Sequence, residues 1–125
     1  MNLPEVKNQQ KLGKLGESLA ARYLQKCGYS IIERNFHIRY GEIDIIARDG
    51  DTLVFVEVKT RKSTQFGLPE EAITSRKLHE LVQTAAFYNT QHNTHAIKQR
   101  MDLVAIRMDK NNHVEYLKHI QNISM

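Results

Sequence analysis

Three charged residues stand in two segments that otherwise read as apolar β-strands. The stretch from Gly41 to Lys59 reads GEIDIIARDGDTLVFVEVK, and Asp44, Glu57 and Lys59 are among its charged members. Acidic residues are rare inside sheets, and a buried carboxylate without a partner is costly. A glutamate within Val-Phe-Val-Glu-Val therefore needs a compensating partner, and a divalent cation is the candidate that this pattern predicts.

The turn between the two strands decides whether the carboxylates can meet. Asp49 and Gly50 are a strong hairpin signal. If they form a two-residue turn, Asp44 lies opposite Phe55 and shares a face with Glu57, at a diagonal of about 7–8 Å between backbones. A three-residue turn or a bulge would send Asp44 to the opposite face, so the predicted site depends on the turn.

Two carboxylates on one face predict a site for a hard cation. Mg²⁺ is commonly held by one or two carboxylates together with waters and a substrate phosphate, so we expect Asp44 and Glu57 to bind Mg²⁺ or Mn²⁺. Lys59 shares the face of Glu57 and is placed to orient or help deprotonate an attacking water. This set of groups predicts a phosphodiester hydrolase. The alternative is a surface ion pair between Glu57 and Lys59 on a half-exposed strand.

The rest of the sequence predicts one α/β domain around this hairpin. Apolar residues at steps of three and four predict helices, and runs of β-branched and aromatic residues predict strands. Helices are expected over about 8–26 and 69–89, and strands over 29–36, 43–48, 52–60, 101–108 and 113–120. The order is αβββαββ, which implies a mixed sheet flanked by helices.

Length and composition exclude several classes of protein. The 125 residues suffice for a single domain with one core, and 41% hydrophobic and 26% charged residues are typical of a globular chain rather than a disordered one. The sequence contains neither an apolar run of membrane-spanning length nor a signal peptide, so we expect a cytoplasmic protein with no membrane partner. The single cysteine, Cys27, excludes an internal disulfide and is expected to be a buried hydrophobe. The net charge of +4 favours a polyanionic partner.

The same residues carry a family resemblance. The element order and the residues Asp44, Glu57 and Lys59 resemble the PD-(D/E)xK nuclease superfamily, with Ile43 in place of its proline. Over almost the whole chain, four segments resemble the bacterial YraN family, which is itself similar to archaeal Holliday-junction resolvases: GESLAARYL, GYSIIERNF, GEIDIIARDGDTLVFVEVKTR and RMDLVAI. The resemblance implies a restriction-endonuclease-like core and, by analogy, cleavage of structured or branched DNA.

Two further acids are candidates to support the site. The resemblance to the resolvases implies that Glu17, on the first helix, completes the acidic cluster as a ligand or through a water. The alternative is a boundary glutamate paired with Lys14 or another basic residue. Glu42 shares the strand parity of Asp44 and is expected to support it, whereas a salt bridge to Arg39 is the equally weighted alternative.

Basic residues near the hairpin are candidate phosphate contacts. Four residues are expected to have this role: Arg39, Arg61, Lys62 and Lys77. Lys77 lies close to the buried side of its helix, so it can instead brace the acids or remain solvated. Asp102 matches the Arg-Phe-Asp pattern of the family, with Met101 in place of Phe. We expect Asp102 to anchor Lys77 or Arg100 rather than to contact substrate.

The leading hypothesis is a Mg²⁺-dependent endonuclease that acts on structured or branched DNA, with RNA left open as a substrate. Two alternatives remain: a non-catalytic nucleic-acid-binding module of the same fold, and an interaction protein whose acids form a buried salt-bridge network. Symmetric cutting of a four-way junction would need two copies of the site, so a homodimer is a further hypothesis.

Overall fold

The computed structural model describes residues 3–62 and 67–123, with side chains from residue 10 onward. The elements follow the order α1 (Leu3–Lys26), β1 (Ser30–Ile38), β2 (Gly41–Asp49), β3 (Thr52–Arg61), η1 (Pro69–Glu71), α2 (Ser75–His92), β4 (Lys98–Met108) and β5 (Val114–Ile120). The predicted order αβββαββ is confirmed, with the short helix η1 added before α2.

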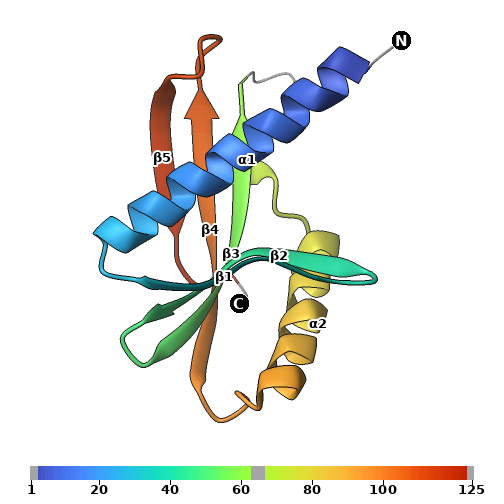
Figure 1. Ribbon diagram of the computed structural model, residues 1–125, viewed down its shortest axis with the longest axis vertical. Helices are drawn as coiled ribbons and strands as arrows, with labels where there is room; N and C mark the ends of the chain where they lie inside the picture. Colours follow the sequence, from blue (N-terminus) through green and yellow to red (C-terminus); the bar gives the residue numbers. More distant parts are fainter. Residues whose placement is uncertain (1–2, 63–66, 124–125) are drawn as a thin grey trace.

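The strands form one mixed sheet in the order β1-β2-β3-β4-β5. Strands β1, β2 and β3 are joined as antiparallel hairpins, β4 runs parallel to β3, and β5 is antiparallel to β4. A parallel pair needs a crossover connection, which α2 provides. Helix α1 crosses one face of the sheet and α2 lies on the other side (Figure 1). This mixed sheet between helices is consistent with a restriction-endonuclease-like core.

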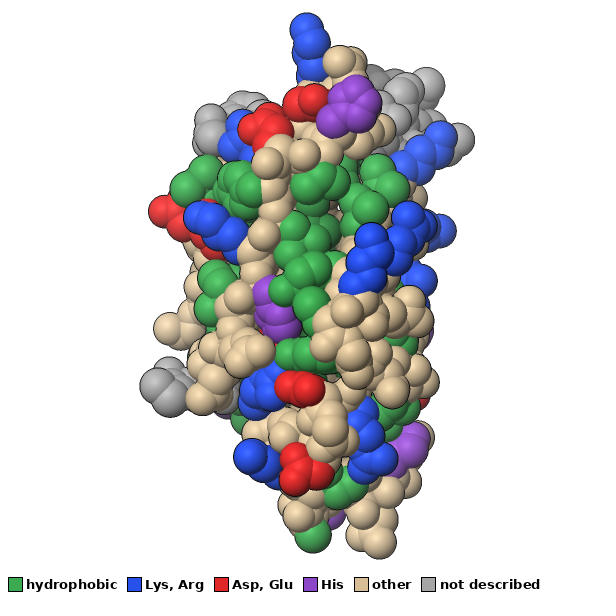
Figure 2. All heavy atoms as spheres, turned by 90° about the vertical axis from the view of Figure 1, so that its left-hand side faces the viewer, with side chains coloured by type: hydrophobic (Ala, Val, Ile, Leu, Met, Phe, Trp, Pro, Cys, Tyr) green, Lys and Arg blue, Asp and Glu red, His purple; other side chains and the backbone are tan. Residues whose placement is uncertain are grey.

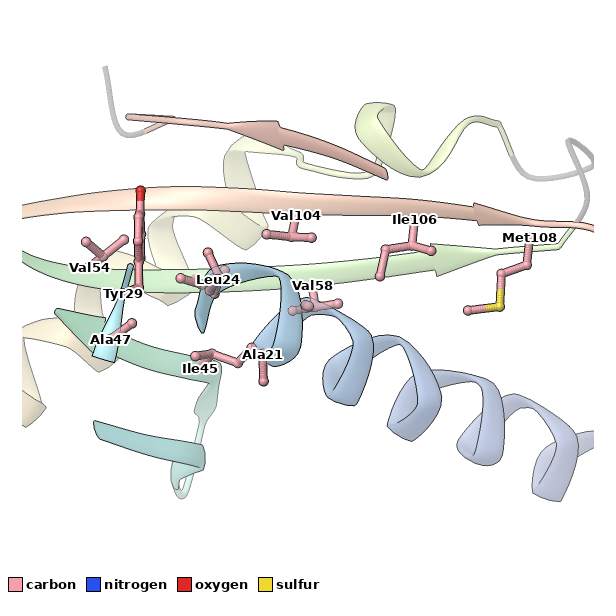
Figure 3. Close-up of a cluster of buried hydrophobic side chains, with 12 residues drawn as sticks. Ala21, Leu24, Tyr29, Ile45, Ala47, Val54, Val58, Val104, Ile106 and Met108 are labelled. Carbon is pink, nitrogen blue, oxygen red and sulfur yellow. The ribbon is translucent and has the colours of Figure 1, made fainter. Parts of the chain in front are cut away.

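Each face of the sheet has its own apolar cluster. Alternate residues of β3 enter different clusters, because successive side chains of a strand point to opposite faces. Val54 and Val56 pack with Leu24 of α1, whereas Phe55 packs with Leu81 of α2. In the α1-side cluster, side chains from α1, β2, β3 and β4 converge (Figure 3). Strand β3 is therefore buried on both faces up to Val58, and Glu57 must be accommodated inside the protein.

The turn between β2 and β3 differs from the predicted one. Asp49 pairs with Thr52, so Gly50 and Asp51 are the turn residues, and not Asp49 and Gly50 as predicted. Gly50 has a φ of 61°, and a type II′ hairpin turn requires glycine at this first position. The turn still has two residues, so the same side chains of the two strands share a face as predicted. The pairing of the strands is shifted by two residues.

The predicted continuous helix from Pro69 is also corrected. The 3₁₀ helix η1 ends at Glu71, and α2 starts only at Ser75. Thr74 is the N-cap, because its hydroxyl accepts a hydrogen bond from the backbone N–H of Lys77 at 3.1 Å. A threonine side chain that caps a helix in this way competes with continuing the preceding turn.

Cys27 is exposed, so the expectation of a buried thiol was wrong. Helix α1 ends at Lys26, and the chain turns through Gly28 at a φ of 91°. Cys27 therefore lies beyond the helix and its apolar stripe.

No helix of the described ranges is long and apolar enough to cross a membrane.

Strand β5 forms one edge of the sheet and carries exposed apolar residues. Val114 and Ile120 are both exposed. Seen from this side of the molecule, hydrophobic side chains form a strip with Lys and Arg along one border (Figure 2). The acidic residues of β2 and β3 lie in the middle of the sheet order, away from this edge.

Helix α1 approaches β3 closely at Gly16. A Cβ atom on Gly16 would collide with the Thr60 side chain, whereas a Cβ on Gly13 would meet no atom within 4 Å. The glycine therefore permits the close packing that brings the next residue, Glu17, over the sheet.

We predict that Gly16→Ala lowers the free energy of unfolding by about 1–3 kcal/mol, because the added methyl overpacks the contact. The matched control, Gly13→Ala, should raise it by up to about 1 kcal/mol through helix propensity. Adding Thr60→Ala to Gly16→Ala should recover part of the loss. Urea denaturation measures all three, and equal stability of the two glycine variants would contradict the close packing.

Candidate functional site

Asp44 and Glu57 lie side by side where the pairing of β2 and β3 ends. The last pair of the ladder is Ile45 opposite Val56. One step further along each strand are Asp44 and Glu57, so the two acids are neighbours across the hairpin. The prediction that Asp44 lies opposite Phe55, diagonal to Glu57, was wrong because the turn is shifted. Both carboxylates are buried, with 7% and 2% exposure.

The strand β2 is irregular at Asp44. Its carboxylate accepts a hydrogen bond from the backbone N–H of Val58 at 2.8 Å. Ile43 packs in the α2-side cluster and Ile45 in the α1-side cluster, although regular alternation would put them on one face. This break allows Asp44 to interact with acids from both sides of the sheet.

Glu17 of α1 is one of these acids. Partial burial raises its pKa to about 7, with further contributions from the nearby charge of Asp44 and a hydrogen bond to it. Two carboxylates that share a hydrogen bond must share a proton. Lys14, one alternative partner of Glu17, is exposed and makes no ion pair with it within the described chain. Another basic residue, Arg34, acts on Glu17 through its charge and lowers the pKa, but burial and Asp44 outweigh it. The structure thus brings Glu17 into the acidic cluster.

Asn35 holds Glu17 in place, and sequence reasoning missed it. With its amide nitrogen turned toward α1, Asn35 donates to both carboxylate oxygens of Glu17, at 3.1 and 3.2 Å. Asn35 has a φ of 55° within β1, a left-handed conformation in which asparagine is enriched. An asparagine beside Phe36 in a strand of mixed polarity carries no clear signal, so its contact with α1 could not be derived from the sequence.

Glu57 pairs with Lys77 of α2. The Lys77 Nζ lies 3.3 Å from Glu57 Oε2 and 3.3 Å from Glu80 Oε1. The ion pair is close enough for attraction but poorly directed, since Glu57 Oε2 is buried without a well-formed hydrogen bond. The burial of Lys77 lowers its pKa, but the two glutamates outweigh this effect and raise it overall.

The positive charge near Glu57 does not balance the acids. The pKa of Glu57 is raised to about 9, first by burial and then by a hydrogen bond to Asp44 and by the charge of Asp44. The charges of Lys77 and Lys59 act in the opposite direction and are outweighed. The acidic cluster therefore retains protons at neutral pH. A cation bound nearby would stabilise the ionised carboxylates and replace these protons.

Lys59 lies two residues after Glu57 on β3 and is partly exposed. Its ammonium group forms no ion pair with a described side chain, and Glu57 pairs with Lys77 instead. The surface pair of Glu57 with Lys59, one of the sequence-based alternatives, does not form. Lys59 is thus a cation beside the acids that is available to a ligand.

These donors fit a partial ligand set for a hard cation. Among the residues that the structure describes, no group of three or more His, Cys, Asp or Glu side chains could hold a metal ion. Asp44 and Glu57 instead offer two neighbouring carboxyl groups, and a bound cation would take the place of the proton that the raised pKa of Glu57 retains at neutral pH. Mg²⁺ is bound by such pairs, with waters and a substrate phosphate filling its other positions. The fit rests on the donor chemistry and on the incompletely bonded Glu57 oxygen.

Arg39 and Glu42 lie at the start of the β2 hairpin. The Arg39 guanidinium stacks over Tyr40, 5.3 Å from the ring centre, and within the described residues it makes no salt bridge to Glu42. Glu42 is exposed, and its charge makes a minor contribution to the raised pKa of Glu17. Glu42 is therefore near the acidic cluster, but within the described part of the chain it forms no hydrogen bond with Asp44.

The other predicted basic residues divide into two groups. Arg61 ends β3 and donates to the backbone carbonyl of Thr60 at 3.4 Å, and Lys62 follows it as an exposed residue. Lys77 is held between Glu57 and Glu80, so its charge braces the acids and is not free for a phosphate. Arg61 and Lys62 remain as candidate phosphate contacts.

Asp102 is fully buried on the α1 side of the sheet and belongs to a separate network. It accepts hydrogen bonds from Arg100 Nε at 3.0 Å and from the backbone N–H of Asn122 at 3.1 Å, and it lies 2.8 Å from His119 Nε2. Burial raises its pKa, but these hydrogen bonds outweigh burial and lower it overall. Asp102 therefore anchors Arg100 and β5, whereas Lys77 lies on the opposite face of the sheet.

The fold and these acids define the class of protein. It is an α/β protein with a restriction-endonuclease-like sheet, in which carboxylates cluster where the central hairpin opens. A family model described as "Uncharacterised protein family UPF0102" matches residues 16–106, a span that contains Glu17, Asp44, Glu57 and Lys59.

The chain belongs to the UPF0102 family, which agrees with the resemblance of its motifs to YraN. A UPF0102 protein of Syntrophomonas wolfei is 59% identical over 78 residues, covering 62% of this chain and 68% of its own length. One from Syntrophus aciditrophicus is 47% identical over 98 residues, covering 78% and 77%. One from Caldicellulosiruptor saccharolyticus is 43% identical over 115 residues, covering 92% and 98%. These names assign a family and no activity.

We predict that Glu57→Gln stabilises the metal-free protein at pH 7 by about 1–3 kcal/mol. The pKa of Glu57 rises on folding from 4.5 to about 9. The free energy of unfolding is therefore highest, as far as Glu57 is concerned, below pH 4.5, and it falls as the pH rises toward 9. Glutamine does not titrate, so the variant avoids this loss of stability.

Urea denaturation in EDTA at pH 5 and pH 8 tests this prediction. The advantage of Glu57→Gln should be larger at pH 8, and the exposed β5 control Glu115→Gln should show no such trend. A variant that is less stable than the natural protein at both pH values would contradict the raised pKa of the buried Glu57 carboxyl group.

Asp102→Asn should lower the free energy of unfolding by about 2–4 kcal/mol at pH 7, because charged hydrogen bonds to a buried carboxylate are lost. The folded pKa of Asp102 lies below its ordinary 3.8, so its stabilising effect is present above that pH and is lost as the pH falls through the folded value. The difference between the two proteins should thus shrink on acidification. Denaturation at pH 7 and pH 3.5, with the exposed turn variant Asp51→Asn as control, measures it, and a constant difference would argue against a charged Asp102.

Proposed function

We propose that this protein is a divalent-metal-dependent nuclease that hydrolyses phosphodiester bonds in structured or branched DNA. The supporting observation is the neighbouring placement of Asp44 and Glu57, two buried carboxylates with insufficient positive charge around them. A site of this kind favours a cation, and a cation held by two carboxylates leaves positions for water and a phosphate oxygen. Cytoplasmic DNA would supply the polyanion that the basic chain favours.

Asp44 and Glu57 would hold Mg²⁺ or Mn²⁺. When bound, the ion would polarise the phosphate and lower the pKa of a water molecule bound to it. The chain prepares this site by fixing both carboxylates. Asp44 is tied to the backbone of Val58, and Glu57 is tied to Lys77. Fixed ligands avoid reorganisation when substrate binds.

Lys59 is the group that we assign to the reaction centre. It lies beside Glu57, is partly exposed and has no acidic partner of its own among the described residues. Its ammonium can therefore orient the attacking water and offset charge that develops on the phosphate. Glu17 is near Asp44 and has a pKa of about 7, which suits an acid that exchanges a proton near neutral pH.

Three basic residues lie near this site, of which Arg39 and Lys62 are exposed and Arg61 is partly buried. Arg39 lies at the β1–β2 turn, and Arg61 and Lys62 lie at the end of β3. Contacts of this kind position a nucleic-acid backbone without reading its sequence, and they make binding weaker at higher salt.

One observation favours a different function. The ion pairs of Lys77 with Glu57 and Glu80 form a partly buried network, as an interaction protein with structural acids would have. Such a protein, or a binding module without catalysis, would keep the fold without cleaving DNA. Activity and metal dependence distinguish these possibilities.

The test uses purified protein with plasmid, linear duplex, single-stranded and four-way-junction DNA, with and without Mg²⁺ or Mn²⁺. We expect metal-dependent cleavage, lowered at least about 100-fold by Asp44→Ala and by Lys59→Ala. Asp51→Ala and Lys110→Ala, two exposed residues in turns, serve as matched controls and should keep full activity.

Binding without cleavage would support the non-catalytic module, and neither binding nor cleavage would support the interaction protein. Cleavage that survives in Asp44→Ala would contradict the assigned site. Light scattering decides the associated homodimer hypothesis, which symmetric cutting of a four-way junction requires.

A further inference from the structure

A surface hollow of about 340 Å³ lies where the β1–β2 hairpin meets α2. Its lining residues are His37, Ile38, Tyr40, Gly41, Glu42 and Glu80. The hairpin passes beside α2 at this point (Figure 1). The volume lies within the range of sites that take small organic groups.

The hollow is adjacent to the acidic site. Lys77 Nζ lies 3.3 Å from Glu80 Oε1, which lines the hollow, and 3.3 Å from Glu57 Oε2. One ammonium group thus links the two places. A group in the hollow would therefore lie near a phosphate held at Asp44 and Glu57.

The hollow is held in shape by tight packing at Gly41. A Cβ on Gly41 would collide with the Thr84 hydroxyl and lie 3.1 Å from Glu80 Cγ. Thr84 is itself buried and donates to the backbone carbonyl of Glu80 at 2.8 Å. The turn therefore rests directly on α2, and the lining is preformed.

Tyr40 gives the hollow an aromatic wall. Tyr40 is 79% exposed, so its aromatic ring is accessible to a ligand. The guanidinium group of Arg39 lies over this ring. Aromatic side chains and arginine planes are the groups on which unpaired bases stack, at about 1–3 kcal/mol per base.

The carboxylates of Glu42 and Glu80 select what can enter. They repel a phosphate, which excludes the nucleic-acid backbone from the hollow itself. They accept hydrogen bonds from amino groups, such as those on cytosine and adenine. The lining therefore fits a nucleobase that stacks on Tyr40 and donates a hydrogen bond to an acid.

We propose that this hollow seats an unpaired nucleobase that carries an exocyclic amino group, next to the phosphodiester at the acidic site. The inference rests on the proposed nuclease function and narrows its substrate. A base can reach the hollow only when it is not paired and stacked in a duplex, so the preferred DNA has an unpaired nucleotide at the cleavage point, as at a branch, flap or single-stranded end.

Binding of fluorescein-labelled oligonucleotides in EDTA tests the hollow separately from catalysis. By fluorescence anisotropy, the natural protein should bind oligo-dC more tightly than oligo-dT, because thymine has no amino group. Tyr40→Ala should weaken oligo-dC binding about 10-fold, the effect of losing one stacked base. Tyr40→Phe keeps the ring and should bind normally, and Glu42→Gln should reduce the difference between dC and dT.

Phe87→Ala is the matched control, since Phe87 is an exposed aromatic residue of α2 that does not line the hollow. Circular dichroism confirms the fold of each variant. Equal binding of dC and dT, no detectable binding, or unchanged binding in Tyr40→Ala would each overturn the base-binding hollow.

The two proposals fail differently. Tyr40-dependent binding of oligo-dC without cleavage of any DNA would support the hollow and overturn the nuclease function. Metal-dependent cleavage of fully paired duplex that is unaffected by Tyr40→Ala would support the nuclease function and overturn the hollow.

Discussion

The structure is organised around a repulsion between buried carboxylates. Asp44 and Glu57 approach each other where β2 and β3 separate, and Glu17 approaches Asp44 from α1. Burial in this poorly solvated site, and then the charge of Asp44, raise the pKa of Glu17 and of Glu57, and Lys77 offsets this at Glu57 only in part. A fold selected only for stability would replace such a cluster by apolar side chains or by a balanced ion pair. The cluster makes physical sense when a ligand of opposite charge completes it.

Several local features exist to hold these acids against their repulsion. The absence of a side chain at Gly16 lets α1 approach β3, and Asn35 then fixes Glu17 by two hydrogen bonds. The backbone of Val58 satisfies Asp44 at the place where the ladder ends. Each contact fixes one carboxylate from a different element. The geometry of the site thus depends on the whole sheet and both helices, rather than on the hairpin alone.

The sequence was sufficient for the order of elements and for the residues that carry charge into the core. Apolar periodicity identified both helices and all five strands of the described chain, and Glu57 stood out within an apolar run. The register of the hairpin was not accessible in the same way. Both Asp49-Gly50 and Gly50-Asp51 are good turn pairs, and both place Gly50 at a positive φ. The choice between them depends on the sheet that the strands join.

The residues that pair with the acids also could not be predicted from the sequence, for a different reason. Lys77 is twenty residues from Glu57, and Asn35 is eighteen residues from Glu17, so periodicity within one element says nothing about either pair. These contacts appear only when helices pack on the sheet. The position of Lys77 also depends on where α2 begins. The Thr74 cap starts the helix at Ser75, and this start determines which turn of the helix faces β3.

The irregularity of β2 at Asp44 links the acidic site to the hollow beside it. A regular strand would direct Asp44 to one face of the sheet only, and then either Glu17 or Glu57 would lie out of its reach. The strand changes face between Ile43 and Ile45, and just before this point Gly41 rests on α2. The same short segment therefore brings three carboxylates together and forms the wall of a base-sized hollow. A site that binds a phosphate and the base attached to it needs this proximity, and a structural salt-bridge network does not.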